Sequence, residues 1–497
     1  MRRELGLRLS RIWSQVARSD RNQKSWPDDR PSMLAEPVAP ASWRELLSGE
    51  RLLRYALICA GTWLNAADTL MTATIMPSVA RDIGGYAWFG WTVAGFLLGS
   101  ILAGATAGRL SLRLGLRRAL ALGGSAYAVG CVVSALAPGI VVFLGGRLLQ
   151  GIGGGWIAGL GYVAVTRLFP ERLWTRALGG LSGVWGVATL MSPLIGGLFA
   201  QIGFWRGSFW LFAGQSLVYV AAVSLLIERD PPRAGRETSP PPLLQVAVLA
   251  GGIIAIASAG LTASGAGAMG LGATGLLLMA LFLRVDARAP SALLPRSAGD
   301  PTSRIGSGLA MVFCLGAASV SYTVYGPAIF QALYGATPVA AGYILGCEAF
   351  AWTAAALLVA SSHRPGLAIR AGAVTVTLSI AALSLVVPHG GLVAIATFGA
   401  AQGAGFGLCW SFTASRIAAA VSEAERALAS SSMPTTQMIG TAAGAAAAGA
   451  VANQFGFGAG ITPERAMQGG FWLFAGFAPL ALLGCLAAWR LTTEAKA

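Results

Sequence analysis

Three charged side chains stand out because each lies inside a long apolar stretch of the sequence: Asp68, Arg147 and Glu348. Of the 20 acidic residues, only Asp68 and Glu348 fall well inside such a stretch. A charge in an apolar layer costs several kcal/mol unless it is paired or hydrated, so each of the three is a functional candidate. A buried carboxyl group takes up or releases a proton when its burial or its pairing with arginine changes. We therefore predict that Asp68 or Glu348 exchanges a proton and that Arg147 takes part in the exchange.

The three charges are expected at a comparable depth. At 1.5 Å of helix rise per residue, Asp68 lies ~24 Å from the beginning of its stretch, and Arg147 and Glu348 lie ~10–12 Å from the beginning of theirs. Because the last two stretches run in the opposite direction, Asp68 can pair with Arg147, while Glu348 stands in the other half. The alternatives are an ion pair that only fixes helix packing and, for Glu348, a structural role or contact with a cationic ligand without protonation.

Neighbouring side chains extend these positions into a candidate substrate cavity. Asn65 and Thr72 share the helix face of Asp68 by their spacing, and Trp352 shares that of Glu348. Aromatic rings bind cationic and planar compounds, although core packing is the ordinary fate of a single tryptophan. The candidates for an aromatic cavity are Trp63, Trp185, Trp352 and Trp410.

The elements that carry these residues are long apolar helices. The chain has 497 residues, of which 55% are hydrophobic and 11% are charged, and its mean hydropathy is +0.66. So few charges cannot cover a water-facing surface, which excludes a soluble enzyme, a disordered protein and a secreted disulfide scaffold. Stretches of the ~20 residues that cross a bilayer recur along the chain and predict an all-α membrane protein. There are fourteen, at residues 52–79, 86–108, 119–137, 140–166, 177–200, 208–227, 243–262, 267–283, 305–334, 340–360, 367–387, 391–415, 430–452 and 469–489.

The basic residues set the orientation of these helices. Of 35 Lys and Arg residues, 11 lie in the tail up to Arg54 and 20 lie in the loops after even-numbered stretches and at the C-terminus. Only Arg81, Arg206 and Arg465 lie in the opposite loops. By the positive-inside rule both termini are cytoplasmic, as in a multi-pass protein of the bacterial inner membrane. The net charge of +15 is then a topology signal and a contact with lipid headgroups, not a nucleic-acid surface.

An internal repeat divides the chain. The hexapeptide Phe-Trp-Leu-Phe-Ala-Gly occurs at 209–214 and again at 471–476, and Gln-Gly-x-Gly occurs at 150–153 and 402–405. The offset is nearly constant, so stretches 1–6 match stretches 9–14, and stretches 7 and 8 are an insertion. Two six-helix halves around a central site are the layout of a secondary transporter, here in a 6+2+6 arrangement. The predicted parts are a basic cytoplasmic tail 1–51, an N-terminal half 52–227, linkers with two inserted helices 228–304, a C-terminal half 305–490 and a cytoplasmic tail 491–497.

No catalytic or cofactor site is expected. Residues 265–270 fit a glycine-rich dinucleotide pattern, but they connect two apolar stretches and no strand precedes them. The six cysteines fall in apolar stretches without metal-ligand spacing, and the two histidines are isolated. We therefore expect neither an enzyme nor a metal or cofactor. The expected partners are a small-molecule substrate, protons and membrane lipids, with the chain as a monomer.

Two helices and one loop resemble a known family in the right order. Asp68 is followed by Pro77, and Arg147 begins the run Arg-Leu-Leu-Gln-Gly. Between them, residues 108–118 have glycines and arginines at regular spacing, with Leu112 in place of an aspartate. These features resemble the major facilitator superfamily, specifically its fourteen-span drug:proton antiporter branch, over about residues 52–490. The resemblance implies that Arg147 takes part in proton coupling and that glycines 108 and 115 supply a tight turn.

Further motifs extend the resemblance. Residues 192–197 are similar to the glycine-rich, proline-kinked antiporter motif, and 325–331 match another helix of the branch. The implied function is proton-coupled export of small amphiphilic or cationic compounds, such as drugs or toxic metabolites, by alternating access. The alternative is a dedicated transporter of one metabolite or lipid, exporting or importing. The resemblance gives conformational roles to Gly108, Arg113, Gly115, Arg117, Pro193, Gly196 and Gly197, and it adds Gln150, Tyr325 and Gln331 to the candidate cavity.

Overall fold

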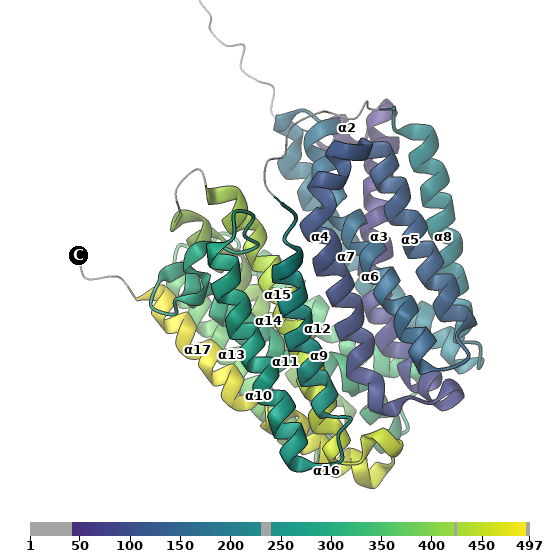
Figure 1. The fold of residues 1–497 in the computed structure, drawn as a ribbon, viewed down its shortest axis with the longest axis vertical. Coiled ribbons are helices and arrows are strands. Elements are labelled where there is room, and N and C mark those ends of the chain that lie inside the picture. Colours follow the sequence, from purple (N-terminus) through teal and green to yellow (C-terminus); the bar gives the residue numbers. More distant parts are fainter. Residues whose placement is uncertain (1–41, 230–239, 422–424, 494–497) are drawn as a thin grey trace, which may run out of the picture. The chain divides into compact units, whose positions relative to one another are not determined.

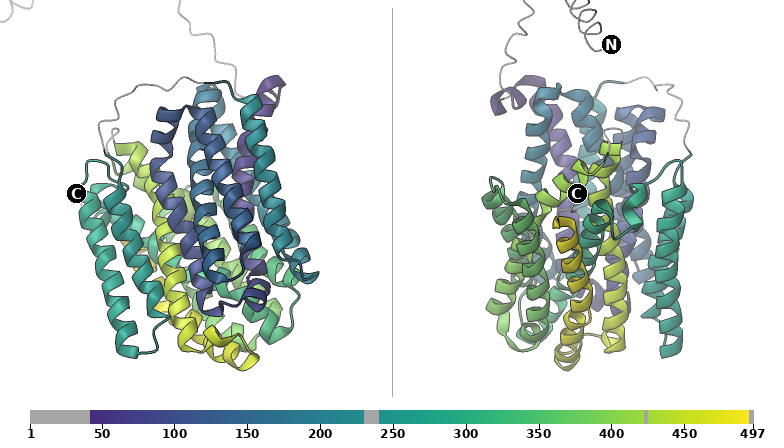
Figure 2. Two further views of the ribbon diagram at one scale, coloured as in Figure 1. Left: turned by 45° about the vertical axis from the view of Figure 1, so that its right-hand side comes forward. Right: turned by 90° about the vertical axis from the view of Figure 1, so that its left-hand side faces the viewer.

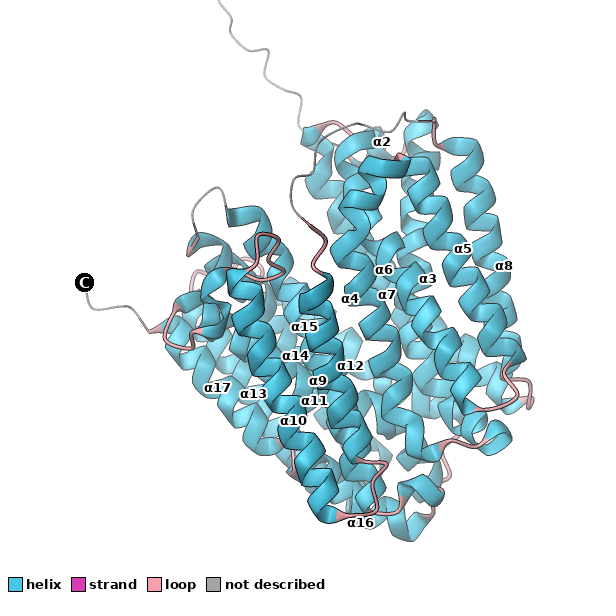
Figure 3. Ribbon diagram, in the orientation of Figure 1, coloured by secondary structure: helices cyan, strands magenta, loops and turns pink. Residues whose placement is uncertain are grey.

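The computed structural model describes residues 42–229, 240–421 and 425–493, and the chain from Trp43 onward forms one compact unit. Every regular element in these ranges is a helix, and no strand occurs among them (Figure 3). The all-helical fold expected from the composition is therefore confirmed. Most of the predicted basic tail, residues 1–41, lies outside the described residues.

Six long helices form what we call the N-terminal group. They follow the short helix α2 (Trp43–Leu46), and each overlaps one of the first six predicted stretches (Figure 1). A 3-10 turn, η2 (Tyr86–Trp88), precedes the second of them. The six are α3 (Gly49–Ile83), α4 (Phe89–Leu114), α5 (Leu116–Leu136), α6 (Ile140–Leu168), α7 (Glu171–Gln201) and α8 (Arg206–Leu226).

Two antiparallel helices, α9 (Leu243–Ala259) and α10 (Gly265–Arg288), cover the predicted insertion and pack on each other (Figure 2). The turn η3 (Arg296–Gly299) leads from them into the C-terminal group. That group is α11 (Arg304–Tyr334), α12 (Pro338–Val359), α13 (Pro365–His389), α14 (Gly391–Ala419), α15 (Arg426–Gln454), the turn η5 (Phe457–Ala459), α16 (Pro463–Ala475) and α17 (Ala478–Thr492).

The two copies of the repeated hexapeptide differ in whether the helix continues through them. In α8 the segment 209–214 lies inside a continuous helix, whereas in the C-terminal group the helix ends at Ala475 and a new one starts at Ala478. Pro479 stands in the first turn of α17, where its missing N–H is tolerated. Proline alone does not explain the break, because α3 continues through Pro77 and α11 through Pro327. The single stretch predicted at 469–489 is two helices in the structure.

Eleven helical segments of the described residues are long and apolar enough to cross a membrane. The other three predicted spans correspond to α3, α9 and α15. Of these, α9 has only 17 residues, and α3 and α15 carry more charged or hydroxyl side chains. All fourteen predicted stretches are thus helical, while length and hydropathy alone identify eleven of them as spans.

The two groups repeat one packing scheme. In the N-terminal group α6 packs against α4 and α5, and in the C-terminal group α14 packs against α12 and α13. A Cβ atom on Gly151 of α6 would fall against the carbonyl of Phe96 on α4, and one on Gly403 of α14 would fall against the carbonyl of Glu348 on α12. Phe96 and Glu348 therefore occupy equivalent positions, as the repeat in the sequence leads one to expect.

The groups meet at the end of the molecule that carries residues 84–90 and 455–460, which we call the closed end. There the ring of Phe89 stacks on that of Tyr325, with centroids 5.7 Å apart and planes at 19°. Asn453 Nδ2 donates a hydrogen bond to the carbonyl of Ala87 at 2.9 Å. These contacts join α4 and η2 of one group to α11 and α15 of the other.

The inserted helix α9 covers the line where α4 meets α15. Its residues Leu249 and Ile253 belong to one apolar core with Ile101 of α4 and with Ile439 and Ala446 of α15. The insertion is therefore packed against both groups and not attached to the outside of one.

Candidate functional site

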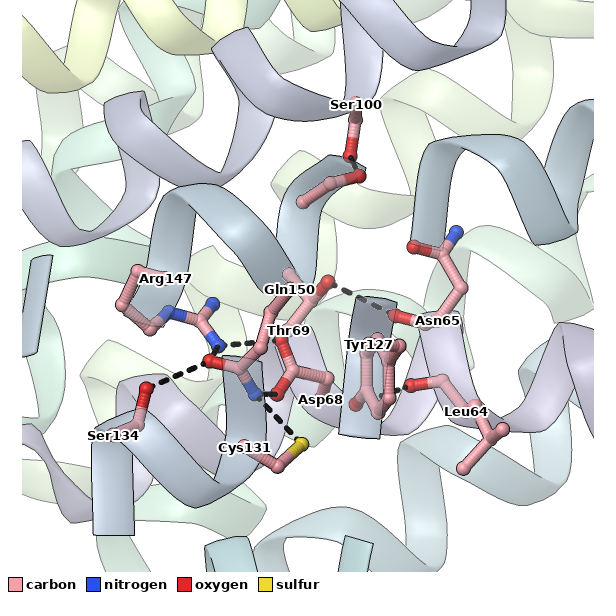
Figure 4. Close-up of polar contacts among 11 residues, drawn as sticks. Leu64, Asn65, Asp68, Thr69, Ser100, Tyr127, Cys131, Ser134, Arg147 and Gln150 are labelled. Atoms are coloured by element: carbon pink, nitrogen blue, oxygen red, sulfur yellow. Dashed lines mark hydrogen bonds and ion pairs between the residues drawn. The ribbon is translucent and has the colours of Figure 1, made fainter. Parts of the chain in front are cut away.

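A buried ion pair joins α3 to α6. Arg147 Nη1 lies 2.7 Å from Asp68 Oδ2, and the two side chains are 2% and 0% exposed (Figure 4). The pairing expected from the depth of the two residues is thus present. Since apolar helices surround it, either charge would be left uncompensated if the other were neutralised or moved away.

Hydrogen bonds hold both charges in place. Gln150 Nε2 donates to Asp68 Oδ1 at 3.3 Å, while Gln150 Oε1 accepts from Arg147 Nη1 and from Ser134 Oγ, each at 3.1 Å. The guanidinium of Arg147 also stands over the ring of Phe96, 4.6 Å from its centroid. Arg147 Nε is buried and has no hydrogen-bond partner among the described residues. The guanidinium therefore retains a donor that another arrangement could use.

Glycines let the helices around this ion pair pack in close contact. A Cβ atom on Gly130 of α5 would lie 2.5 Å from the backbone nitrogen of Gln150 on α6, and one on Gly153 of α6 would fall against the backbone of Tyr127 on α5. Small residues let membrane helices approach to backbone contact. The polar cluster is thus enclosed between α3, α4, α5 and α6.

Glu348 lies in a different setting on α12. Gln402 Nε2 of α14 donates to Glu348 Oε1 at 2.8 Å, and within the described ranges Glu348 forms no ion pair. Gln402 is fully buried, and its Oε1 has no partner there. Asp68 is therefore neutralised by a cation, whereas Glu348 faces an amide.

Aromatic side chains adjoin Glu348. The ring of Trp352 stacks on Phe406 of α14, with centroids 4.9 Å apart and planes at 13°, and it lies 5.3 Å from Trp410 at 58°. Two of the four candidate tryptophans thus share one cluster. Of the other two, Trp63 is hydrogen-bonded within the N-terminal group and Trp185 is exposed on α7, so neither belongs to it.

The remaining cavity candidates do not gather at one place. Asn65 is half-buried on α3 beside the ion pair, and Thr72 is buried with no partner for its hydroxyl among the described residues. Tyr325 is buried in the stack with Phe89 at the closed end. Gln331 lines a pocket of about 730 Å³ at that end. The structure thus joins Gln150 to the ion pair and Trp352 to Glu348, and it separates Tyr325 and Gln331 from both.

The rim of the closed-end pocket carries a second acid–base pair. Asp82, beyond the apolar part of α3, pairs with Arg206 and accepts a hydrogen bond from Trp205 Nε1 at 3.1 Å. The Arg206 guanidinium, and after it the Trp205 hydrogen bond, hold the pKa of the Asp82 carboxyl below its usual value. This pair is partly exposed to solvent.

The loop motif between α4 and α5 is confirmed in part. Gly115 joins the two helices with φ of +79°, a conformation that favours glycine, so it supplies the tight turn. The expectation that Gly108 also belongs to the turn is wrong, because α4 continues as a helix to Leu114. Arg113 lies in the last turn of α4 and Arg117 in the first turn of α5, on either side of Gly115.

The proline-kinked motif of α7 lies where the two groups meet. A Cβ atom on Gly342 of α12 would lie 2.6 Å from Pro193 Cβ, and one on Gly197 would lie 2.6 Å from Val339 Cγ2 of α12. Gly196 faces α3 of its own group. Pro193 and Gly197 thus lie at the contact between α7 and α12, and their conformational role stays a prediction.

Several residues of these clusters were not predicted from the sequence as site residues. The repeat of Gln150 at Gln402 was a usable signal, because the two amides contact Asp68 and Glu348 respectively. The others are apolar or weakly polar side chains whose contacts depend on helix rotation, which spacing alone does not give. They are Phe96, Tyr127, Cys131, Ser134 and Phe406.

Comparison with known proteins agrees with this architecture. The family model described as "Major Facilitator Superfamily" matches residues 58–401. A probable multidrug-efflux transporter of Mycobacterium tuberculosis is 33% identical over 471 residues, which cover 91% of this chain and 96% of the relative. A transporter of the acurin A biosynthesis cluster of Aspergillus aculeatus is 33% identical over 182 residues, or 36% of this chain and 32% of the relative.

Solved structures show the same fold at low sequence identity. A D-xylose–proton symporter superposes with a TM-score of 0.66 at 15% identity, covering 90% of this chain and 99% of the other. The nucleoside transporter NupG superposes with a TM-score of 0.64 at 13% identity, covering 89% of this chain and all of the other. The family model and the long match to an efflux transporter, together with the many apolar helices, define a multi-pass membrane transport protein. The chain belongs to the major facilitator superfamily.

Proposed function

We propose that the chain is a proton-coupled secondary transporter that exports small amphiphilic or cationic compounds by alternating access. The observation that carries this proposal is the fully buried pair of Asp68 and Arg147, joined at 2.7 Å inside a membrane helix bundle. A static pair of this kind gives little net stability, since the cost of removing both charges from water offsets their attraction. A pair that opens and closes can instead load and release a proton.

The exchange uses the groups already in contact. When Asp68 takes a proton, it no longer holds Arg147, whose buried Nε lacks a partner among the described residues. The freed guanidinium then favours a conformation in which it finds other acceptors. Release of the proton restores the pair. Glu348 is the second carboxyl group of this scheme, in the C-terminal group, where it can exchange a proton or accept the charge of the substrate.

The proposed topology has fourteen spans in a 6+2+6 arrangement, with the divisions expected from the repeat. Both termini face the cytoplasm of a bacterial cell, and the chain acts as a monomer in the inner membrane. In this orientation the closed end faces outward, so the contacts of Phe89 with Tyr325 and of Asn453 with Ala87 close the outer side. Alternating access then requires these contacts to separate while the opposite ends of the groups approach each other.

The relatives support efflux as the direction and drugs as the substrate class. The Mycobacterium tuberculosis relative, named as a probable multidrug-efflux transporter, matches this chain over nearly its full length. The range of substrates is tested by measuring the transport of neutral, anionic and cationic compounds in proteoliposomes. Transport of one compound alone would favour the dedicated transporter over multidrug export.

The decisive experiment measures substrate flux driven by a ΔpH in proteoliposomes. We expect Asp68→Asn to abolish ΔpH-driven flux and Glu348→Gln to reduce it strongly. The matched control is Glu171→Gln, which makes the same carboxylate-to-amide change at an exposed site at the start of α7. Normal ΔpH-driven flux in the variant that carries both Asp68→Asn and Glu348→Gln would overturn proton coupling through these residues.

A further inference from the structure

The C-terminal group contains an acidic and aromatic cluster that a proton step alone does not explain. Glu348 and Trp352 lie one turn apart on α12, and Gln402, Phe406 and Trp410 follow at intervals of four residues on α14. Residues four apart lie on one face of a helix, so each helix presents a row of polar and then aromatic side chains. The two rows meet, as the contacts of Gln402 with Glu348 and of Phe406 with Trp352 demonstrate.

The polar end of this cluster offers acceptors without a matching donor. One oxygen of Glu348 accepts the hydrogen bond from Gln402 Nε2, and no cation in the described part of the chain pairs with the carboxylate. The amide oxygen of Gln402 is buried and unpartnered within the same residues. A buried acceptor without a donor is unfavourable by itself. A ligand that brings a positive charge and an N–H donor would pair with the Glu348 carboxylate and give the Gln402 oxygen a partner.

The aromatic end offers ring surface that is not fully covered. Phe406 is buried and lies parallel behind Trp352, so it fixes the orientation of that indole. Trp352 and Trp410 are half-buried and inclined at 58° to each other. The indoles of Trp352 and Trp410 thus form a partly exposed aromatic surface, and the Glu348 carboxylate lies one helical turn from Trp352.

The matched positions in the N-terminal group have no such cluster. Phe96 is equivalent to Glu348 and Gln150 to Gln402, and the same offset along the chain gives the N-terminal equivalents of the aromatic residues. All of these equivalents have small side chains. These are Ser100 for Trp352, Gly154 for Phe406 and Ala158 for Trp410. Aromatic side chains in this position are thus particular to the C-terminal group and are not required by the packing scheme that both groups share.

We propose that this cluster is the binding site for a planar aromatic cation, with the positive charge of the ligand at Glu348 and Gln402 and its ring system against Trp352 and Trp410. The inference rests on the proposed function and names the substrate class of its site. Coulombic attraction to the carboxylate and cation–π contacts select the charge, and ring stacking selects flatness. The ligand binds to the C-terminal group, and the ion pair of the N-terminal group does not touch it.

The test is equilibrium binding of ethidium, a planar aromatic monocation, to the purified full-length transporter in detergent without a pH gradient. We expect Glu348→Gln and Trp352→Leu each to weaken ethidium binding by roughly 10- to 30-fold, in line with a desolvated cation–π or charge contact. Trp352→Phe keeps a ring and should weaken it by less than about threefold. Tetraethylammonium has the charge without the plane, so its binding should fall in Glu348→Gln and should fall less than that of ethidium in Trp352→Leu, where it loses a cation–π contact but no stacking.

The control variant is Trp210→Leu, which removes an exposed tryptophan of α8 outside the cluster and should leave ethidium binding unchanged. Thermal unfolding of every variant confirms that it is folded, and Trp410→Leu serves in place of Trp352→Leu if that variant is not. Ethidium affinity within about twofold of the wild type in folded Glu348→Gln, or in both folded tryptophan variants, would overturn the site. Because no gradient is applied, a failure of proton coupling in Asp68→Asn leaves these outcomes unchanged, and the two proposals fail separately.

Discussion

The two helix groups share a packing scheme and differ in the chemistry at its centre. Gly151 faces the carbonyl of Phe96, and Gly403 faces that of Glu348, so the same glycine contact sets the distance between helices in both groups. At the matched position the N-terminal group has a ring beside an arginine, whereas the C-terminal group has a carboxylate. The backbone contacts are thus alike in the two groups, and the side chains at the matched position differ.

The two groups also differ at the position of Arg147. The equivalent of Arg147 is Gly399, and the space beside that glycine is taken by the ring of Tyr322, whose hydroxyl donates to the carbonyl of Ile344 at 2.9 Å. The C-terminal group thus has no cation to neutralise Glu348 at this place. In our proposals the N-terminal group holds the closed pair that exchanges a proton, and the C-terminal group holds the open acid that meets the charge of the substrate.

Breaking the ion pair should have the largest effect of any single change in either group. Arg147→Ala leaves the Asp68 charge buried and alone, and we expect it to lower the free energy of unfolding by about 3–5 kcal/mol. Glu348→Gln removes a charge that has no partner cation and keeps an acceptor for Gln402, so its cost should stay below about 1 kcal/mol. Thermal or denaturant unfolding of the purified protein measures both values.

A double replacement separates stability from transport in the same pair. Asp68→Leu combined with Arg147→Met removes both charges and should regain most of the stability lost in Arg147→Ala, because well-packed apolar residues often replace a buried pair without loss. ΔpH-driven flux should remain absent. If the double variant transported normally, the pair would be only a packing contact; if Arg147→Ala were no less stable than Glu348→Gln, the contrast between the groups would be wrong.

The glycine contacts should respond alike in the two groups. Gly151→Ala and Gly403→Ala each place a methyl group against a carbonyl of the neighbouring helix, and we expect each to cost about 1–3 kcal/mol of stability. Gly95→Ala on α4 is the matched control, since a Cβ atom there meets nothing within 4 Å and should cost little. Unfolding in detergent gives the three values. A large difference between Gly151→Ala and Gly403→Ala would contradict the equivalence of the groups.

The sequence predicts the helices and the ion pair well because both follow from one-dimensional rules. Apolar length places each helix, and the rise per residue brings Asp68 and Arg147 to one depth, where the structure pairs them. The break between α16 and α17 is not predicted by Pro479 alone, because other helices, such as α11 with Pro327, continue through a proline. Hydropathy alone, in contrast, does not identify α3 as a span, because its charged and hydroxyl side chains lower its apolar character.

The aromatic cluster was harder to predict because it depends on helix rotation and partner choice. Spacing puts Trp352 on the face of Glu348, but nothing in the sequence tells that Trp410 joins it while Trp63 and Trp185 do not. The candidates Tyr325 and Gln331 came from resemblance to other chains, and here they lie toward the closed end. Tyr325 stacks on a ring of the other group, and no local pattern in the sequence encodes such a partner.

The ring beside the arginine should have a smaller effect than the pair itself. Phe96→Leu keeps an apolar side chain but removes the π surface 4.6 Å from the Arg147 guanidinium, so we expect a loss of about 0.5–2 kcal/mol in stability. Phe350→Leu, at an exposed ring on α12, is the control for the same chemical change. Equal unfolding midpoints for the two variants would show that the ring does not hold Arg147.

The smallest effect is expected at the closed end, where the groups again differ. Arg206 at the start of α8 pairs with the Asp82 carboxylate, whereas Arg465 in the first turns of α16 donates to the carbonyl of Gly460 at 3.1 Å, which does not titrate. Arg206 and Trp205 hold the pKa of the Asp82 carboxyl below its usual value of 3.8 in the folded protein. The stability that this pair contributes is therefore fully present above about pH 4 and is lost as the pH falls through the lower folded pKa.

The contribution is minor, because both side chains are partly exposed and solvent screens the pair. Unfolding midpoints measured between pH 7 and strongly acidic pH should show a small advantage of the wild type over Asp82→Asn at neutral pH that disappears below the folded pKa of the carboxyl group. Arg465→Gln should show a weaker dependence on pH, because the lowered pKa of the Glu464 carboxyl rests mainly on hydrogen bonds to its own backbone and to Thr462 and only in small part on the Arg465 charge. An advantage over Asp82→Asn that grew on acidification would contradict the lowered pKa and, with it, the role of Arg206 in holding this end of the N-terminal group.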